Sequence, residues 1–532
     1  MKRRELLGKM AVVASGSVLA GTVSASSADK PVNMKIFDNQ ENIPDHHLVF
    51  ASQTGARLDS NVHTGGGTDD TAILQSVLDK VKVSGSLHLV MDGAALIKGI
   101  DIHSNTTIEC LNPSCGFFLA PQSNRAVIRN ANPRLQGERL DKNIAILNGT
   151  YNHNCKEQLH HYTDQNQNST AFGKEVFVIA LEFYGVENFT MRHVTIRNQR
   201  TFAMLMGNWF RVTMENIYID LPDHADAQNQ DGLHFWGPGQ FLSMKNIQGR
   251  SGDDFIALAP DENDYVSGIT DVLIDGVILD NADQGIRLLS RDEGRLDRVI
   301  IKNVTGTYRS FGFYINPWFK GAKGGNFGNI IFDTVDLRQS APNYKYTPPM
   351  LFRLGGRIES ITLRNIYHHN PSDNRSVLDV GWPGLQTEYS YSDTHIKSLL
   401  IDGLHILESD EKSSDSSYIK VIGQVDNMVI RNVEIVRDPA MTQKGCLIET
   451  TKPTADIKSL FISNIVVNRM KNLISHKNGK IDTIQVNNIM GSEMGDAFIT
   501  TDNNIRQVNA SAFYGAKLIS PDGKGKIEKF SG

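Results

Sequence analysis

The chain has 532 residues, of which 40% are hydrophobic and 21% charged, a balance that is typical of a folded globular or solenoid protein and excludes general disorder. The formal net charge is −5 and Lys and Arg form no basic stripe, so nucleic acid is not an expected partner. The four cysteines lack the spacing of zinc ligands, and we expect neither a metal nor a cofactor. Buried thiols and a disulfide between Cys110 and Cys115 are both compatible with the sequence.

The first residues carry the features of an export signal. Residues 2–4 are basic, residues 10–21 are apolar, and small residues follow at 23–25. The apolar stretch is too short for a permanent membrane span. Residues 3–9, RRELLGK, resemble the twin-arginine signal of bacteria, with a general secretory signal as the alternative. We therefore predict a signal over residues 1–28 and a periplasmic or secreted protein.

A segment at about residues 50–100 is predicted to form an N-terminal cap. It reads as a glycine-rich turn, a short helix with Thr68 as its N-cap, and a strand. Asp69 and Asp70 suit the helix N-terminus better than catalysis. The segment resembles the cap of the pectate-lyase superfamily, in which a helix covers the open end of the core. The predicted apolar face of the helix consists of Ala72, Leu74, Val77, Leu78 and Val81.

From about residue 188 one phrase recurs, in which alternating apolar residues are followed by Asn or Gly and then by an aliphatic residue. Successive aliphatic markers are 23 to 38 residues apart. The markers are Val194, Ile217, Ile247, Val277, Val304, Val335, Ile366, Leu404, Val433, Ile465 and Ile489. Asn precedes seven of the eleven markers, and Asn and Gly both tolerate the left-handed backbone of a tight turn.

These repeats predict an all-β fold in which each copy forms one coil of a solenoid. Alternation places one set of aliphatics inward, and parallel strands stack each coil on the next. Leucine-rich repeats are the competing solenoid, but they need a shorter and more even period. We predict a single parallel β-helix over residues 29–532, and the resemblance to the pectate-lyase superfamily implies a right-handed one.

Two acidic phrases, Asn229-Gln230-Asp231-Gly232 and Gly252-Asp253-Asp254, lie about one coil apart. Residues one coil apart lie on neighbouring strands, roughly 4.8 Å from each other. The phrases sit at different distances from their markers, and an eight-residue insertion at 221–228 accounts for the difference. We expect this insertion to form one wall of a binding cleft.

The same alternation predicts a column of polar side chains beside the aspartates on one solvent-exposed face. His234, Arg287, Tyr314 and Arg353 each stand between two apolar residues of a strand. Trp236 and Trp318 follow such strands, where they can stack on sugar rings. The remaining predicted substrate-binding residues are Gln284 and Asn316.

Crowding of Asp231, Asp253 and Asp254 raises at least one pKa, which leaves a protonated acid beside ionised partners. Glycoside hydrolysis needs such a set, with one acid to protonate the leaving oxygen and a base to activate water. Alternatively, the aspartates bind a cation or cap turns. The two phrases on neighbouring coils, with an arginine on the next, favour the catalytic interpretation.

At these residues the sequence resembles glycoside hydrolase family 28, the polygalacturonases and rhamnogalacturonases, which are inverting enzymes with NTDG and DD motifs. The resemblance implies that Asp253 is the general acid and that Asp231 and Asp254 position the attacking water. It is clearest over about residues 188–320. Asp283-Gln284-Gly285 replaces the Gly-His-Gly of the family, and Tyr314-Ile315-Asn316 replaces its Arg-Ile-Lys. Arg287 and Arg353 offer different cations for a carboxylate or sulfate.

We therefore expect an inverting hydrolase acting on a polysaccharide, with an acidic or sulfated glycan as one option. A lyase or epimerase is the second hypothesis, with Arg287 and a calcium ion on the three aspartates neutralising a uronate. A non-catalytic glycan-binding solenoid is the third. The segment after about Asn503 lacks the marker phrase, and either a cap on the last coil or a loose tail is compatible with it.

Overall fold

The computed structural model describes the chain over the following residues: 47–158, 178–222, 229–263, 265–290, 293–317, 324–340, 349–369, 377–381, 394–408, 417–441 and 445–531. Residues 43–532 form one compact unit, distinct from residues 1–42. The predicted signal, Trp318 and residues 223–228 of the predicted insertion lie outside the described residues.

The described residues contain four short helices, which are η1 Ala51–Gln53, α1 Thr71–Leu78, α2 Val81–Ser84 and η2 Cys155–Glu157. None of them is long and apolar enough to cross a lipid bilayer.

Strands make up most of the remainder. Strands of the first half are β1 His47–Phe50, β2 Leu87–Met91, β3 Ala94–Ile97, β4 Ile100–Ile102, β5 Thr106–Cys110, β6 Gly116–Leu119, β7 Ile128–Asn130, β8 Asp141–Leu147, β9 Thr150–Asn152, β10 Leu181–Arg192, β11 Thr195–Arg197, β12 Met204–Asp220, β13 Leu233–Trp236, β14 Gly239–Gly249, β15 Asp254–Ala259 and β16 Gly268–Leu289. Strands of the second half are β17 Arg295–Asn316, β18 Asn326–Gln339, β19 Met350–Leu354, β20 Arg357–His369, β21 Leu378–Val380, β22 His395–Glu408, β23 Ile419–Val421, β24 Gln424–Arg437, β25 Cys446–Thr450, β26 Asp456–Asn468, β27 Asn472–His476, β28 Lys480–Ser492, β29 Ala497–Thr501, β30 Ile505–Tyr514, β31 Lys517–Ile519 and β32 Ile527–Ser531.

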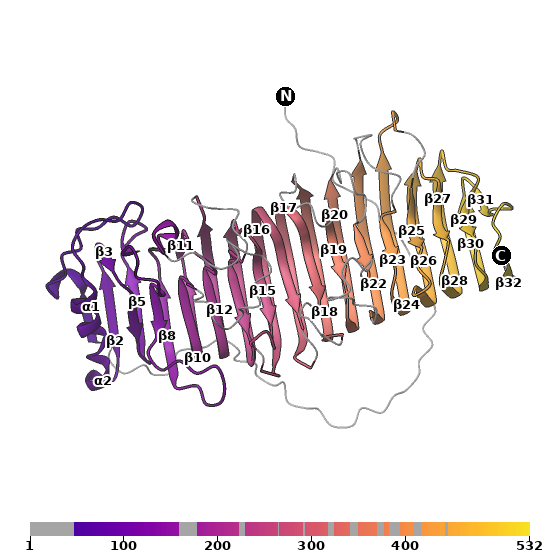
Figure 1. Cartoon of the computed structure of the whole chain (residues 1–532). Coiled ribbons are helices and arrows are strands. Elements are labelled where there is room, and N and C mark those ends of the chain that lie inside the picture. Colours follow the sequence, from indigo (N-terminus) through magenta and orange to yellow (C-terminus); the bar gives the residue numbers. More distant parts are fainter. Residues whose placement is uncertain are drawn as a thin grey trace, which may run out of the picture. The chain divides into compact units, whose positions relative to one another are not determined.

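These strands stack as the coils of a parallel β-helix, which confirms the predicted fold class. Each strand of one coil pairs in parallel with the corresponding strand of the next, as in the series β20, β22, β24, β26, β28 and β30. Figure 1 shows the strands following one another in chain order from β2 to β32. One hydrophobic cluster runs through the coils from Ala51 to Leu518.

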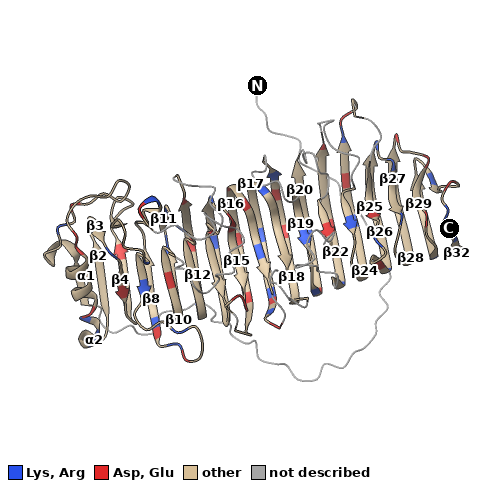
Figure 2. Ribbon diagram, in the orientation of Figure 1, with Lys and Arg blue, Asp and Glu red and all other residues tan. Residues whose placement is uncertain are grey.

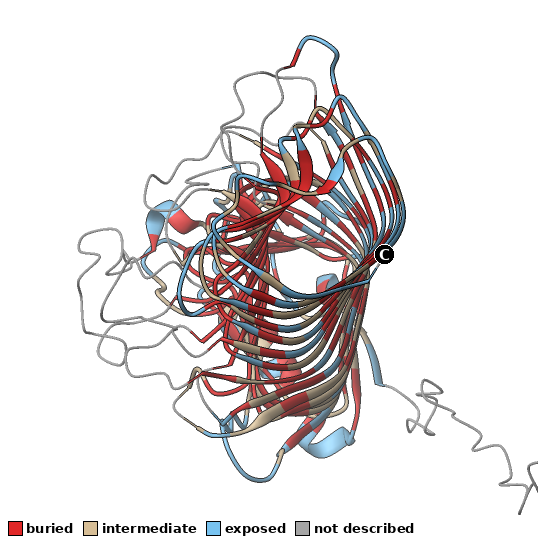
Figure 3. Ribbon diagram, turned by 90° about the vertical axis from the view of Figure 1, so that its right-hand side faces the viewer, coloured by how far each residue is buried: buried red, intermediate tan, exposed pale blue. Residues whose placement is uncertain are grey.

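The eleven markers form a continuous column inside this core. Ile217 pairs with Ile247, Ile247 with Val277, and the series continues marker to marker as far as Ile489. All eleven are at most 2% exposed, and burial of each Val, Leu or Ile stabilises the fold by about 1.5–3 kcal/mol. Buried and exposed positions alternate along the coils in Figure 3, as the sequence pattern predicts.

The residue before each marker turns the chain in a left-handed conformation, which confirms the role predicted for Asn and Gly. All seven of the asparagines have φ between 51° and 58°, and Gly276 and Gly403 have φ of 86° and 85°. Side-chain amides join neighbouring coils, because Asn488 donates to Asn464 and Asn464 donates to Asn432, each over 3.0 Å.

A column of alternating charge runs beside the markers on the outer surface, and we call it the charge ladder. Its strand register puts a cation next to an anion at every step. Lys302 contacts Asp275 at 3.0 Å, and Arg431 contacts Asp402 at 2.8 Å. Figure 2 shows the basic and acidic residues on the strands. The ladder consists of Arg192, Glu215, Lys245, Asp275, Lys302, Asp333, Arg364, Asp402 and Arg431.

The predicted N-terminal helix is present, but it begins later than predicted. The residue before α1 is Asp70, not Thr68, because Thr68 is held outside the helix by hydrogen bonds to the Asp59 carboxylate. Asp70 accepts two backbone N–H groups of the preceding loop and Asp69 accepts one from Thr71, so both carboxylates are structural, as predicted. Ala72 is exposed, contrary to the prediction. The residues of α1 that enter the core of the first coils are Leu74, Val77 and Leu78.

The C-terminal segment continues the coils instead of forming a loose tail. Strand β30 pairs with β28, which places Phe513 next to Ile489 and extends the marker column by one step. Strand β32 adds a further pairing on β30. The four cysteines are all buried and free, so the compatible disulfide does not form.

Candidate active site

Strand register brings the two acidic phrases side by side. Leu233 of β13 pairs with Ile256 of β15, an offset of 23 residues that aligns Asp231 with Asp254. The Gly232 N–H donates to the Asp254 carbonyl at 2.9 Å. A Cβ atom on Gly232 would lie 2.2 Å from the Phe255 carbonyl oxygen, so only glycine permits this approach.

Asp253 is partly exposed, whereas Asp231 and Asp254 are buried. Its Oδ2 accepts the backbone N–H of Asn229 at 3.1 Å, and its Oδ1 accepts the Gln284 side-chain amide at 2.7 Å. Both donors are uncharged. The carboxylate is therefore oriented by two hydrogen bonds and keeps access to solvent.

Asp254 is buried, with 9% of its surface exposed. Among the described residues, its Oδ1 has no hydrogen-bond partner. Burial raises the pKa of Asp254 well above its ordinary value, the negative charges of Asp253 and Asp231 raise it further, and the Arg287 guanidinium opposes them. Asp253 directly precedes Asp254, and the strand register aligns Asp254 with Asp231, so the three aspartates lie on adjacent strands.

Asp231 belongs to a chain of hydrogen bonds that sequence reasoning did not predict in full. Its Oδ2 contacts His234 Nδ1 at 2.6 Å, and His234 Nε2 contacts the Glu262 carboxylate at 2.5 Å. The same Glu262 oxygen accepts the indole N–H of Trp236 at 2.9 Å. The imidazole also stacks on the Phe202 ring, with centroids 4.6 Å apart.

Within this hydrogen-bond chain, the pKa values of the members are shifted in different directions. Burial raises the pKa of Asp231 to about 7, although the hydrogen bond from His234 opposes the rise. Burial disfavours a charged His234, but Glu262 and Asp231 outweigh it and raise the His234 pKa to about 10. Burial raises the pKa of Glu262, and the His234 charge more than offsets this, so the net shift is downward. At neutral pH His234 is a buried cation between two carboxyl groups.

The predicted column of polar side chains is correct in register. His234 pairs with Ala257, Ala257 with Arg287, Arg287 with Tyr314, and Tyr314 with Arg353. The same register continues upstream from His234 to Leu205, Glu182, Arg129 and Asp101, and we call the whole series the site column.

The prediction that this face is open to solvent is wrong. His234, Arg287, Tyr314 and Arg353 are 3%, 6%, 2% and 1% exposed. Aromatic and polar neighbours cover them, and Phe311, Tyr314 and Met350 form a separate apolar cluster on this face. The alternation of a strand determines which side of the backbone a residue faces, but not whether other residues cover it.

The arginines of the site column are held by neighbours. Arg287 lies 4.0 Å from the centre of the Tyr314 ring and donates to Gln284 at 3.2 Å. Burial raises the Tyr314 pKa to about 12, and the Tyr314 hydroxyl accepts the Asn316 amide at 3.0 Å. Arg353 lies over the Phe311 ring and 3.5 Å from the Asp379 carboxylate.

Two predicted residues stand apart from the rest. Trp318 lies outside the described residues. Trp236 belongs to β13 itself rather than to the segment after it, and its ring stacks on Tyr184 with centroids 6.3 Å apart. Glu262 was missed because it follows β15 in a turn, where no alternating pattern marks it. Among the described residues, no group of three or more His, Cys, Asp or Glu is arranged to hold a metal ion.

Known proteins resemble the chain in this region. The model of glycosyl hydrolases family 28 matches residues 131–277, about a quarter of the chain, and the match includes Asp231, Asp253, Asp254, His234 and Glu262. This match starts and ends earlier than the resemblance over 188–320 that the motifs indicate. A search of curated proteins finds no match.

Solved structures match the chain at low sequence identity. The tailspike protein of E. coli bacteriophage HK620, solved in complex with a pentasaccharide, matches with a TM-score of 0.50 and 11% identity over 84% of this chain and 75% of that one. The Yersinia enterocolitica family 28 exopolygalacturonase matches with a TM-score of 0.43 and 14% identity over 90% and 79%. The chain is thus a parallel β-helix protein that resembles glycoside hydrolase family 28, and the family match supports a polysaccharide-hydrolysing enzyme.

Proposed function

We propose that this protein hydrolyses glycosidic bonds of a polysaccharide with inversion, using Asp231, Asp253 and Asp254. The observation that carries the proposal is the meeting of these three carboxyl groups, one partly exposed and two buried, on adjacent strands. Inverting hydrolysis needs a proton donor and an ionised base at the same pH. Because burial raises the pKa of two members, the coupled set holds both a proton and negative charge near neutral pH.

The exposures of the three groups suggest how the roles divide. Asp253 is the accessible member and already lies in a fixed orientation, so we assign it to the glycosidic oxygen as general acid. Asp231 and Asp254 then orient the attacking water. This is the division that the family resemblance implies. Burial favours the protonated forms of Asp231 and Asp254 in the free protein.

His234 and Glu262 are assigned positioning roles. Their hydrogen bonds fix the Asp231 carboxyl group, and a cationic His234 favours its ionised form. We assign contacts with the sugar to Gln284, Arg287 and Trp236. Tyr314 and Asn316 are buried, and we assign them the positioning of Arg287. Trp318 and Arg353 remain predictions for more distant contacts.

The nature of the glycan and the place of action are further parts of the proposal. Arg287 is an arginine whose charge acts on Asp254, and we assign it contact with an acidic or sulfated sugar. The basic and apolar residues at the start of the chain support export to the periplasm or the medium.

Digestion of a panel of neutral, uronate-containing and sulfated polysaccharides, with product NMR, tests the proposal. The wild-type protein should release reducing ends of inverted anomeric configuration from one glycan class. The Asp253→Asn variant should be roughly a thousandfold slower, because general acid catalysis contributes about 10²–10⁴-fold. The matched control is Asp280→Asn, which removes a carboxylate that is 68% exposed on β16.

Other outcomes would contradict the proposal in distinct ways. An unsaturated product, detected by its ultraviolet absorbance, would establish the lyase hypothesis instead. Retention of glycan without cleavage, unchanged in the Asp253→Asn variant, would establish the binding solenoid.

A further inference from the structure

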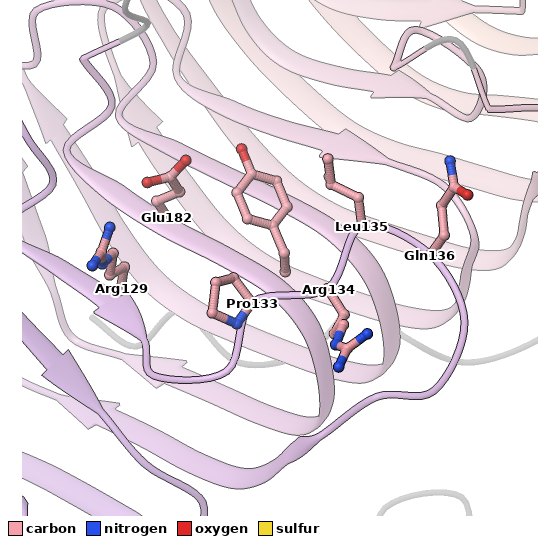
Figure 4. Close-up of a pocket in the computed structure, with 7 residues that line it drawn as sticks. Arg129, Pro133, Arg134, Leu135, Gln136 and Glu182 are labelled. Carbon is pink, nitrogen blue, oxygen red and sulfur yellow. The ribbon is translucent and has the colours of Figure 1, made fainter.

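A pocket of about 470 Å³ opens upstream of the three aspartates, and nothing so far assigns it a function. Its walls come from the segment between β7 and β8 and from β7 and β10. Figure 4 shows Arg129 and Glu182 at one side of the pocket and Leu135 at the other. Pro133, Leu135 and the ring of Tyr184 supply apolar surface.

The pocket and the candidate active site lie on the same column of strand register. Glu182 pairs with Leu205, which pairs with His234, so the pocket lies two strands before the imidazole in the site column. Two strand spacings are roughly 10 Å. The Tyr184 ring stacks on Trp236, whose indole N–H donates to Glu262. A glycan that lies along the column and has a bond at Asp253 therefore reaches the pocket with another of its sugar units.

The apolar part of the pocket suits a sugar ring. Pyranose rings stack their C–H faces on aromatic side chains, and Tyr184 offers a ring together with the apolar surface of Leu135 and Pro133. Leu135 is 41% exposed although it is a large hydrophobic residue, so burial under a ligand would remove apolar surface from water.

The charged groups of the pocket favour an uncharged sugar. Glu182 shares a hydrogen bond with the Tyr184 hydroxyl and retains acceptor capacity for sugar hydroxyl groups. Arg129 is already paired with Asp101 at 2.6 Å, and Arg125 binds the same carboxylate at 2.7 Å. Figure 4 shows the guanidinium of Arg134, the other cation of the lining, pointing away from Glu182. A sugar carboxylate beside Glu182 would therefore face that carboxylate, while Arg129 is hydrogen-bonded to Asp101.

We propose that the pocket formed by Tyr184, Glu182 and Leu135 is a subsite for a neutral sugar residue. This residue belongs to the glycan whose cleaved glycosidic bond lies at Asp253. This inference rests on the proposed function for its ligand class. The subsite binds a unit that is not cleaved, and it thereby selects glycans that extend past the site of cleavage.

Calorimetric titration of the full-length Asp253→Asn variant tests the subsite without relying on cleavage. The probes are cello-, xylo- and galacto-oligosaccharides as neutral chains and oligogalacturonides as acidic chains, each from the dimer to the hexamer. Binding of a neutral series should strengthen with length. Leu135→Ala and Glu182→Gln should each remove about five- to tenfold of that gain for the longer oligomers and leave the dimers unchanged.

Matched controls come from the same elements. Leu140→Ala truncates a leucine of similar exposure, 39%, on the same inter-strand segment but outside the pocket. Glu187→Gln neutralises another glutamate of β10 that does not line it. Circular dichroism and thermal melting check that all four variants fold.

Three outcomes would overturn the proposal. The two pocket variants can bind the long neutral oligomers as tightly as their controls, the Asp253→Asn protein with Glu182 intact can bind the acidic series more tightly than the neutral series, or no probe can bind at all. Length-dependent binding through Leu135 and Glu182 in a protein that cleaves no glycan would retain the subsite and reject the hydrolase. Cleavage without any effect of the pocket variants would do the reverse.

Discussion

The charge ladder and the site column are built by the same parallel register, yet they place charges in opposite ways. On the ladder every carboxylate has a cation on the next strand, and the Arg431 hydrogen bond lowers the pKa of Asp402. At the site the register aligns Asp231 with Asp254, and burial raises the pKa of both. Charge pairing on the outer surface stabilises the coils, whereas the aligned carboxyl groups cost stability and provide reactivity.

Among variants that leave the three aspartates unchanged, Glu262→Gln is expected to have the largest effect, because it removes the anion that holds His234 as a cation. We expect kcat to fall roughly a hundredfold, which corresponds to about 2.7 kcal/mol. The His234 pKa, raised to about 10 in the wild type, should drop, and NMR titration of the imidazole measures this directly. The matched control is Glu434→Gln, which neutralises an exposed glutamate 3.5 Å from the partly buried His405. An unchanged His234 titration would contradict the assigned positioning role.

Asp254→Asn should abolish activity and yet stabilise the fold. Because the native pKa lies above the ordinary value of 3.8, the folded state binds the proton more tightly than the unfolded state. Wild-type stability therefore declines as pH rises from about 3.8 through the native pKa, and the variant removes this decline. We expect about 1–2 kcal/mol of added stability at pH 8 and less at pH 5, measured by urea unfolding. A destabilised Asp254→Asn protein at pH 8 would show that the carboxylate is well solvated.

Asp402→Asn on the charge ladder should have the smallest effect and the opposite sign. The lowered pKa of Asp402 means that its contribution is present above about pH 3.8 and is lost as pH falls through the native pKa. We expect a loss of about 0.5–1 kcal/mol at neutral pH, reduced by added salt. A double-mutant cycle with Arg431→Gln measures the pair directly. A loss as large as that of a core truncation would mean that the ladder determines the fold.

The fold was predictable because its signals are local. The marker residues, the asparagines before them and the apolar neighbours of His234, Arg287 and Tyr314 each follow from a short stretch of sequence. The Thr68 cap was predicted wrongly because the competing hydrogen bonds come from Asp59, across the glycine-rich turn.

The site was predictable only where it follows the strand pattern. Glu262 reaches His234 from a turn after β15, and the burial of Arg353 depends on Phe311 of another coil. The sequence also contains a signal for one residue of the pocket. Glu182 stands between Leu181 and Phe183 just as His234 stands between Leu233 and Phe235, so extending the same alternation upstream would have added it to the column.

The left-handed residue before each marker explains how the coils tolerate unequal lengths. Ile366 and Leu404 are 38 residues apart and Leu404 and Val433 only 29, yet each pair is in direct register. Each coil therefore returns to the same register position at its marker, whatever the length of the preceding coil. A loop between two strands can therefore lengthen or shorten, and change the shape of the binding surface, while the three aspartates stay aligned.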